Sequence, residues 1–177
     1  NKANERFRHP AIIIANHQSF IDILVLLSLS SKVLMMTNHW VWHSPFFGAI
    51  IRYADFYYIG EGYEQYIERM KKKVEEGYSI AVFPEGTRTY NGKMKRFHKG
   101  AFYLAETLQL DILPILLYGN DKIIAKAQPF SVRKGIIYTE ILPRIPAGDP
   151  SFGATYQERT KRISTYMKQE YARICRE

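Results

Sequence analysis

The chain is expected to fold as one α/β domain in which helices flank a largely parallel central sheet. Short apolar segments alternate along the sequence with longer amphipathic ones, which is the order that strand–helix units produce. The 177 residues contain no Gly/Ser-rich linker and no internal repeat, and their number is enough for a sizeable core. We therefore treat 1–177 as a single domain. Because it opens on Asn1 rather than on a methionine, we expect it to be a segment of a longer chain.

The expected elements follow from apolar periodicity and from helix-start signals. The first half gives a buried strand at 11–15, an amphipathic helix over 19–30 and a strand at 32–37. A helix over 44–53, with proline at its first helical position, an aromatic strand at 56–59 and a charged helix over 62–76 follow. The second half gives strands at 78–83, 111–118 and 135–142, a helix over 100–108, and a C-terminal helix from 154 whose apolar residues share one face. Ligands of such folds gather where strands end and helices begin.

A histidine and an aspartate stand at the first of these junctions, in the stretch NHQSFID at 16–22. One interpretation is a capping box, in which Ser19 begins the helix and Asp22 closes the box. That interpretation leaves His17 unexplained. A histidine side chain has an ordinary pKa of about 6.5 and suits proton transfer near neutrality. His17 and Asp22 are therefore candidate catalytic residues.

A second polar loop, FPEGTRT at 83–89, follows the strand at 78–83. Gly86 lets the backbone turn sharply or approach a ligand closely. The planar guanidinium of Arg88 suits a phosphate group. The structural alternative is a Glu85–Arg88 pair that pins the turn, and the sequence leaves both interpretations open.

Metal and membrane-spanning roles are not favoured by the sequence. The single Cys175 excludes an intramolecular disulfide, and His39 and His43 lack an adjoining glutamate and a third ligand, so we expect no metal site. The longest apolar stretch, 23–29, is far shorter than the ~20 residues that span a bilayer. The net charge of +8 and the aromatic cluster HWVWHSPFF, which contains Trp40 and Trp42, instead predict contact with a membrane surface.

Taken together, the motifs resemble those of the lysophospholipid and glycerolipid acyltransferases. NHQSFID resembles the H-x4-D motif of that family, and FPEGTRT resembles its F-P-E-G-T-R-S motif. The stretch LDILPILLYG at 110–119 is similar to the apolar segment that the family centres on V-P, and 44–60 is similar to its second block. The resemblance extends from Pro10 to about Leu142.

This resemblance implies transfer of a fatty acyl group from a thioester, acyl-CoA or acyl-carrier protein, to a hydroxyl or amine of a lysolipid-type acceptor. It implies a part in phospholipid biosynthesis, peripheral placement at the cytoplasmic face of a membrane, and no cofactor besides the acyl donor. His17 would act as general base, and Asp22 would hold the imidazole tautomer and stabilise the imidazolium. No enzyme nucleophile is then needed, which agrees with a sequence that lacks a G-x-S-x-G elbow.

The resemblance also assigns residues to binding. It places Glu85, Gly86 and Arg88 at the acceptor, with Arg88 on an anionic group. We expect neighbouring residues to contact substrate as well, namely Asn16, Ser19 and Thr87. Contacts with the donor or the membrane are expected from a further set, namely Lys93, Lys95, Lys99, Trp40 and Trp42.

The basic segment 86–100, which contains no acid, allows two alternatives that are not enzymes. One is a catalytically silent binder of anionic lipid. The other is a nucleic-acid module in which Tyr90 and Phe97 stack on bases. The intact His17 and Asp22 argue against the first, and no nucleic-acid motif accompanies the second. We therefore expect no nucleic-acid partner.

One departure from the family pattern concerns the acceptor. In the members that use glycerol phosphates, the second block usually ends in an arginine that helps to hold the phosphate, but this chain has the stretch GEG at 60–62. A phosphate held by Arg88 without that second arginine is less well stabilised. The sequence thus predicts an acceptor with less negative charge than lysophosphatidic acid, unless a lysine of 93–99 replaces the arginine.

Overall fold

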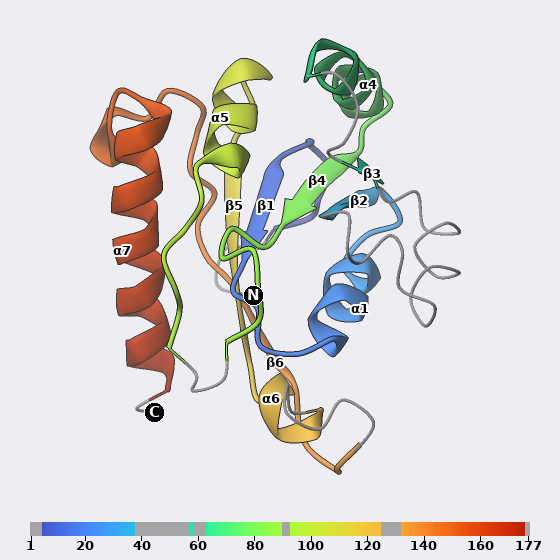
Figure 1. Ribbon diagram of the computed structural model, residues 1–177, viewed down its shortest axis with the longest axis vertical. Helices are drawn as coiled ribbons and strands as arrows, with labels where there is room; N and C mark the ends of the chain where they lie inside the picture. Colours follow the sequence, from blue (N-terminus) through green and yellow to red (C-terminus); the bar gives the residue numbers. More distant parts are fainter. Residues whose placement is uncertain (1–4, 38–56, 59–62, 90–92, 125–131, 176–177) are drawn as a thin grey trace.

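The computed structural model describes residues 5–37, 57–58, 63–89, 93–124 and 132–175. Within these ranges six strands form one sheet in the order β3-β2-β4-β1-β5-β6 (Figure 1). All neighbouring pairs run parallel except β5 and β6, which run antiparallel. The predicted α/β domain with a largely parallel sheet is therefore confirmed.

The strands are short and strongly apolar, as expected for a sheet that is covered on both faces. They comprise β1 (Ile12–Ala15), β2 (Val33–Thr37), β3 (Tyr57–Tyr58), β4 (Ser79–Val82), β5 (Ile112–Tyr118) and β6 (Tyr138–Ile141). Every residue of the central strand β1 is buried. Its alternating side chains divide the core into two halves, because successive residues of a strand point to opposite faces.

The helices lie on both faces of the sheet, α5 and α7 on one side and α1 on the other (Figure 1). They comprise α1 (Ile21–Ser28), α4 (Tyr63–Glu75), α5 (Gly100–Thr107), α6 (Asn120–Ile123), the 3-10 turn η1 (Pro150–Phe152) and α7 (Tyr156–Ile174). Ile12 and Ile14 of β1 face the core under α4, α5 and α7. Ile13 and Ala15 face the core under α1.

Most predicted elements are present, with ends shifted by a few residues. The strand expected at 135–142 is shorter, covering Tyr138–Ile141, and α6 and η1 were not predicted. The helix expected at 44–53 lies outside the described residues. None of the helices in the described ranges is long and apolar enough to cross a bilayer.

The turn from β5 into α6 requires glycine. Gly119 has a φ of 86°, in the left-handed region that glycine adopts without a steric penalty. A Cβ atom at this position would lie 2.5 Å from the carbonyl oxygen of Ile136. Gly119 therefore allows the chain after β5 to pack closely against the segment before β6, and this places Asn120 at the end of β5.

Candidate active site

The two polar loops lie side by side because they follow neighbouring strands of the sheet. β1 and β4 pair in parallel, with Ile14 opposite Val82, so the loops after them leave the same edge. The backbone N–H of Thr89 donates to the carbonyl oxygen of His17 at 2.9 Å. The two junctions that the sequence singled out thus form one site.

His17 and Asp22 are in direct contact. Nδ1 of His17 lies 2.8 Å from Oδ2 of Asp22. The imidazole also stacks on the ring of Phe83, with the ring centroids 4.0 Å apart and the planes 12° from parallel. The His17 side chain is 13% exposed, and no described residue hydrogen-bonds to its Nε2. Within the described ranges, the ring is therefore held on one edge and one face, and its second nitrogen bonds to none of these residues.

Asp22 accepts hydrogen bonds from four donors although its side chain is fully buried. Oδ2 accepts the backbone N–H groups of Gln18 at 2.6 Å and Ser19 at 2.8 Å, in addition to the His17 ring. Oδ1 accepts the side-chain amide of Asn120 at 2.6 Å. An ionised carboxylate can only accept hydrogen bonds, so the neutral His17 ring must carry its proton on Nδ1, and Nε2 is then unprotonated.

The capping box predicted for this turn is only half formed. Asp22 accepts the Ser19 backbone N–H, as in a capping box. The hydroxyl of Ser19 donates instead to the carbonyl oxygen of Ile124, at 2.8 Å. One carboxylate thus supports both the helix start and the imidazole.

Asn16 and Ser19, expected to contact substrate, are buried and bonded to the protein. The side-chain amide of Asn16 donates to the carbonyl oxygen of Leu117 and accepts its N–H, both at 2.8 Å. This two-way bond joins the end of β1 to β5. The structure therefore gives both side chains a part in holding the loop.

Glu85 is also buried, and it connects the two loops. Oε1 accepts the backbone N–H of His17 at 2.9 Å, and Oε2 accepts that of Lys95 at 2.7 Å. Burial raises the pKa of Glu85, and the two backbone N–H groups oppose this shift. This placement favours a positioning role for Glu85 over direct contact with an acceptor.

Only the tip of the 83–89 loop faces outward, because Pro84 and Thr89 are buried and Arg88 is half-buried. Gly86 and Thr87 are exposed, and the φ of 67° at Gly86 makes the tight turn in which its N–H bonds to the carbonyl oxygen of Phe83. The guanidinium of Arg88 lies over the ring of Phe20, 3.6 Å from its centroid. This cation–π contact holds a cation at the start of α1, three residues beyond His17.

The basic segment after this loop is partly fixed to it. Lys93, Lys95 and Lys99 are exposed, and Nζ of Lys95 donates to the carbonyl oxygen of Arg88 at 3.4 Å. Phe97 is 3% exposed and belongs to the core, so the expectation that it could stack on bases is wrong.

Several residues singled out in the sequence lie outside the described ranges, namely His39, Trp40, His43, Trp42, Tyr90 and the stretch 60–62. Within the part of the chain that is described, no cluster of three or more His, Cys, Asp or Glu side chains could hold a metal ion.

Asn120 is the site residue that the sequence did not reveal. It is fully buried and its amide reaches Asp22 from a helix 98 positions along the chain. The sequence did indicate its position, because Asn120 follows the apolar strand β5 after a single glycine, and β5 pairs with β1. A polar residue at the end of a neighbouring parallel strand could therefore have been expected near His17.

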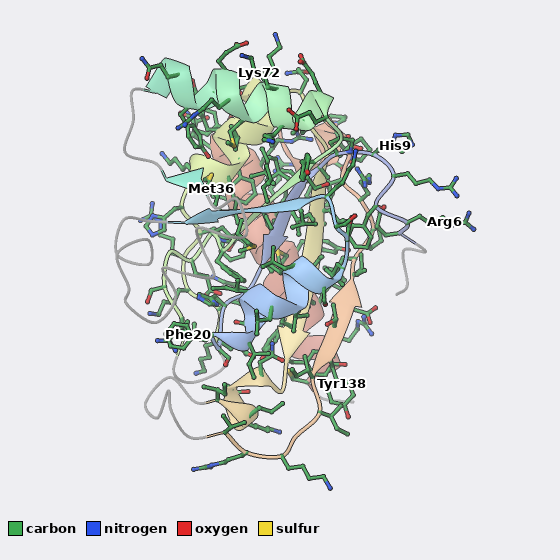
Figure 2. All side chains as sticks on the ribbon, turned by 90° about the vertical axis from the view of Figure 1, so that its right-hand side faces the viewer. Arg6, His9, Phe20, Met36, Lys72 and Tyr138 are labelled. Carbon is green, nitrogen blue, oxygen red and sulfur yellow. The ribbon has the colours of Figure 1, made fainter. Side chains whose placement is uncertain are left out.

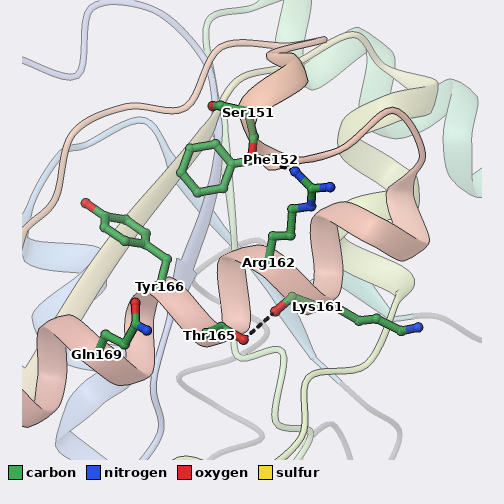
Figure 3. Close-up of a pocket in the computed structure, with 7 residues that line it drawn as sticks. All are labelled: Ser151, Phe152, Lys161, Arg162, Thr165, Tyr166 and Gln169. Carbon is green, nitrogen blue, oxygen red and sulfur yellow. Dashed lines mark hydrogen bonds between the residues drawn. The ribbon is translucent and has the colours of Figure 1, made fainter.

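A hollow of about 380 Å³ lies elsewhere, along α7 and η1 (Figure 3). Its lining residues are Ser151, Phe152, Lys161, Arg162, Thr165, Tyr166 and Gln169. Phe152 and Tyr166 meet edge to face, and Arg162 donates to the carbonyl oxygen of Ser151. None of the lining residues belongs to the loops around His17, so we assign the hollow no catalytic role.

Comparison with known families agrees with the fold and places the chain in a family. The sequence model of the family described as Acyltransferase matches residues 1–118. The chain belongs to this family, which confirms the resemblance seen in its motifs.

Among its relatives, the chain is 34% identical to a chloroplastic 1-acyl-sn-glycerol-3-phosphate acyltransferase of Arabidopsis thaliana, over 65% of this chain and 33% of that protein. It is 26% identical to the human 1-acyl-sn-glycerol-3-phosphate acyltransferase beta, over 77% of this chain and 51% of that protein. The chain thus spans between a third and half of these relatives. The crystal structure of the 1-acyl-sn-glycerophosphate (LPA) acyltransferase PlsC from Thermotoga maritima has the same fold, with a TM-score of 0.76 at 23% identity over 97% of this chain and 68% of that one.

The raised pKa of Glu85 predicts a pH-dependent contribution to stability. Burial makes the folded state bind this proton more tightly than the unfolded state does. The resulting stabilisation is fully present below the ordinary pKa of 4.5 and is lost as the pH rises through the raised folded pKa. Relative to Glu85→Gln, which cannot titrate, the parent should therefore lose free energy of unfolding as the pH rises through this window. Urea unfolding of both proteins from about pH 4 to about pH 8 measures the difference. If the parent instead gained free energy of unfolding relative to Glu85→Gln as the pH rises, the two N–H groups would outweigh burial in setting the pKa of Glu85.

Proposed function

We propose that the chain transfers a fatty acyl group from an acyl-CoA or acyl-carrier-protein thioester to a hydroxyl of a lysophospholipid, a step of phospholipid biosynthesis. The observation that carries this proposal is the 2.8 Å contact between Nδ1 of His17 and Oδ2 of Asp22, which leaves Nε2 available beside the outward-facing loop 83–89. Family membership supports the reaction class, and the names of the relatives support a lysolipid acceptor.

In the proposed reaction the acceptor itself attacks the thioester. Nε2 of His17 takes the proton from the acceptor hydroxyl as its oxygen forms a bond to the thioester carbonyl carbon. Asp22 stabilises the imidazolium that results. The carbon–sulfur bond then breaks, and the departing thiolate receives the proton from His17. The free thiol and the acylated lipid are the products, so the chain itself is never acylated and needs no cofactor besides the donor.

Binding is assigned to the cations around this base, the half-buried Arg88 and the exposed lysines after it. Arg88, fixed over Phe20, is proposed to hold the anionic group of the acceptor. Thr87 and Gly86 line the same outward face of the loop. The exposed lysines of 93–99 are proposed to receive the phosphates of the donor or of neighbouring lipids. Since a thioester donor is soluble and the acceptor lies in a bilayer, we propose a peripheral place at the cytoplasmic face of a membrane.

Two kinds of lysolipid are candidates for the acceptor. The names of the relatives favour 1-acyl-sn-glycerol 3-phosphate. The stretch GEG at 60–62, where the family usually carries an arginine, favours a less charged lipid. Turnover on lysophosphatidic acid and on lysophosphatidylcholine, measured side by side by mass spectrometry of the acylated products, decides between them.

Replacement of the proposed base tests the function itself. His17→Ala should lower acyl transfer by about 10²- to 10⁴-fold, because general-base catalysis typically contributes that much. Asp22→Asn should also be severely impaired, because an amide can reverse the polarity that selects the tautomer. Thioester consumption and lipid product are measured on purified protein, with the exposed His9→Ala as matched control. If His17→Ala kept the parent turnover and thermal stability, His17 would not be the base.

Asn120 is proposed as a positioning residue for this pair. Hydrogen bonds to charged groups contribute about 1.5–3 kcal/mol, so Asn120→Ala should lower kcat by about ten- to a hundredfold. KM for the acceptor should not change, because Asn120 bonds to Asp22 from a buried position. Asn120→Asp should be worse than Asn120→Ala, since it sets a second carboxylate against Asp22. The two variants are compared by steady-state kinetics well below their melting temperatures. If Asn120 had only a structural part, its variants would change the melting temperature, but Asn120→Asp would not have a lower kcat than Asn120→Ala.

A further inference from the structure

A surface that mixes apolar and basic side chains lies beside α6 and takes no part in the chemistry proposed above. We define the 132–138 surface as Val132, Arg133, Lys134, Ile136 and Tyr138. Val132 is 72% exposed, Ile136 67% and Tyr138 47%. Single exposed apolar residues are ordinary, but three within seven residues indicate an interaction site.

Cations are interleaved with these apolar side chains. Arg133 and Lys134 are exposed and lie in sequence between Val132 and Ile136. Lys122 of α6 is exposed as well. The acids of the same region, Asp121 and Glu140, are only partly exposed, so the accessible charge is positive. Figure 2 shows Tyr138 at the end of the molecule opposite α4 and Lys72.

The 132–138 surface is held in place by α6. The backbone N–H of Arg133 donates to the carbonyl oxygen of Ile123 at 2.9 Å. A Cβ atom on Gly135 would lie 2.7 Å from the Ile123 side chain, so the two segments are closely packed. The ring of Tyr138 stacks on Tyr118 of β5, with centroids 4.8 Å apart and planes 5° from parallel. The exposed apolar groups are thus presented on a fixed support.

The same helix contacts the candidate active site. Asn120 of α6 donates to Asp22, and the hydroxyl of Ser19 donates to the carbonyl oxygen of Ile124 just after α6. Among the described residues, α6 therefore contacts both the 132–138 surface and the loop that carries His17. A bilayer on this surface would therefore contact the side of the molecule to which α6 connects the His17 loop.

We propose that the 132–138 surface docks the protein on an anionic lipid bilayer. Val132 and Ile136 enter the boundary between headgroups and acyl chains, where interfacial segments bury apolar area. Arg133 and Lys134 contact the lipid phosphates from there, with their aliphatic stems on the apolar layer. The proposal rests on the proposed function in one respect, that a lipid acceptor must reach His17 from a membrane.

A bilayer fits this surface better than a protein partner does. Lysine is depleted in the centres of protein–protein interfaces, whereas here the exposed Lys134 lies in sequence between the exposed Val132 and Ile136. β6 is an edge strand of the sheet, so pairing with a second copy of the chain is the main competing occupant. The experiments below separate the two.

Sedimentation with vesicles tests the surface. Vesicles are prepared from phosphatidylcholine with and without phosphatidylglycerol, at low and high salt. Arg133→Gln plus Lys134→Gln should weaken binding to the anionic vesicles about thirtyfold at low salt, and less as salt rises. Val132→Ser plus Ile136→Ser should weaken it about tenfold or more at either salt concentration.

The control variant Lys71→Gln plus Lys72→Gln on α4 removes the same charge at the opposite end and should change binding little. Parent-like binding by both surface variants, or an equal loss in the α4 control, would overturn the proposal.

A labelling experiment gives a second readout that needs no loss of binding. In a Cys175→Ser background, an environment-sensitive dye on Ile136→Cys should shift to the blue when anionic vesicles are added. The same dye on Lys72→Cys should not shift. A shift at 136 that follows protein concentration without lipid, together with dimers in sedimentation velocity, would assign the surface to a second copy and overturn the proposal.

Acyl transfer to a short-chain lysolipid below its micelle concentration separates the two proposals. The surface variants should keep the parent rate on this dissolved acceptor while losing binding to vesicles. Loss of vesicle binding in these variants supports the surface even if no acceptor is ever acylated, and only the proposed function then fails. Transfer that persists while the variants bind vesicles like the parent leaves the function standing and refutes the surface.

Discussion

The buried carboxylate of Asp22 is the interaction on which the rest of the site depends. A buried charge is tolerated only when its hydrogen-bonding capacity is filled, and here four donors fill it. Two donors come from the turn before α1, one from the imidazole of His17, and one from Asn120 at the end of β5. A single residue thus fixes the start of a helix, the orientation of the His17 imidazole and the position of a second loop. Removing it would leave all three without their common acceptor.

Glu85 has a comparable part on the other side of the site. Its two oxygens accept backbone N–H groups from two different loops, so the distance between these loops is set by one carboxylate. Together with the bond from Thr89 it holds both the N–H and the C=O of His17. The exposed Gly86 and Thr87 and the half-buried Arg88 consequently lie in a loop whose inner residues are bonded to the His17 turn. Preorganisation of this kind would let the proposed base and cation act on a ligand without reordering the loop.

The sequence predicted the local part of this arrangement and missed the part made by distant segments. His17 and Asp22 are five positions apart after an apolar strand, so their contact follows from one turn of chain. The burial of Glu85 was not predictable, because its partners are backbone groups of loops that only the folded sheet brings together. The bond from Asn120 spans 98 positions and depends on the pairing of β1 with β5. The antiparallel direction of β6 likewise depends on tertiary pairing, since its residues read as an ordinary apolar strand.

The central claim is that Asp22 holds His17 with the proton on Nδ1. Nitrogen-15 chemical shifts of the imidazole, recorded in the free protein at a pH where the ring is neutral, measure the tautomer directly. The sequence has five histidines, and the signals of His17 are identified as the pair that disappears in His17→Gln. Orientation by Asp22 predicts a protonated Nδ1 and a bare Nε2 for His17, and a loss of this preference in Asp22→Asn. A neutral ring protonated on Nε2 in the parent would contradict the assignment of His17 as a base held by Asp22.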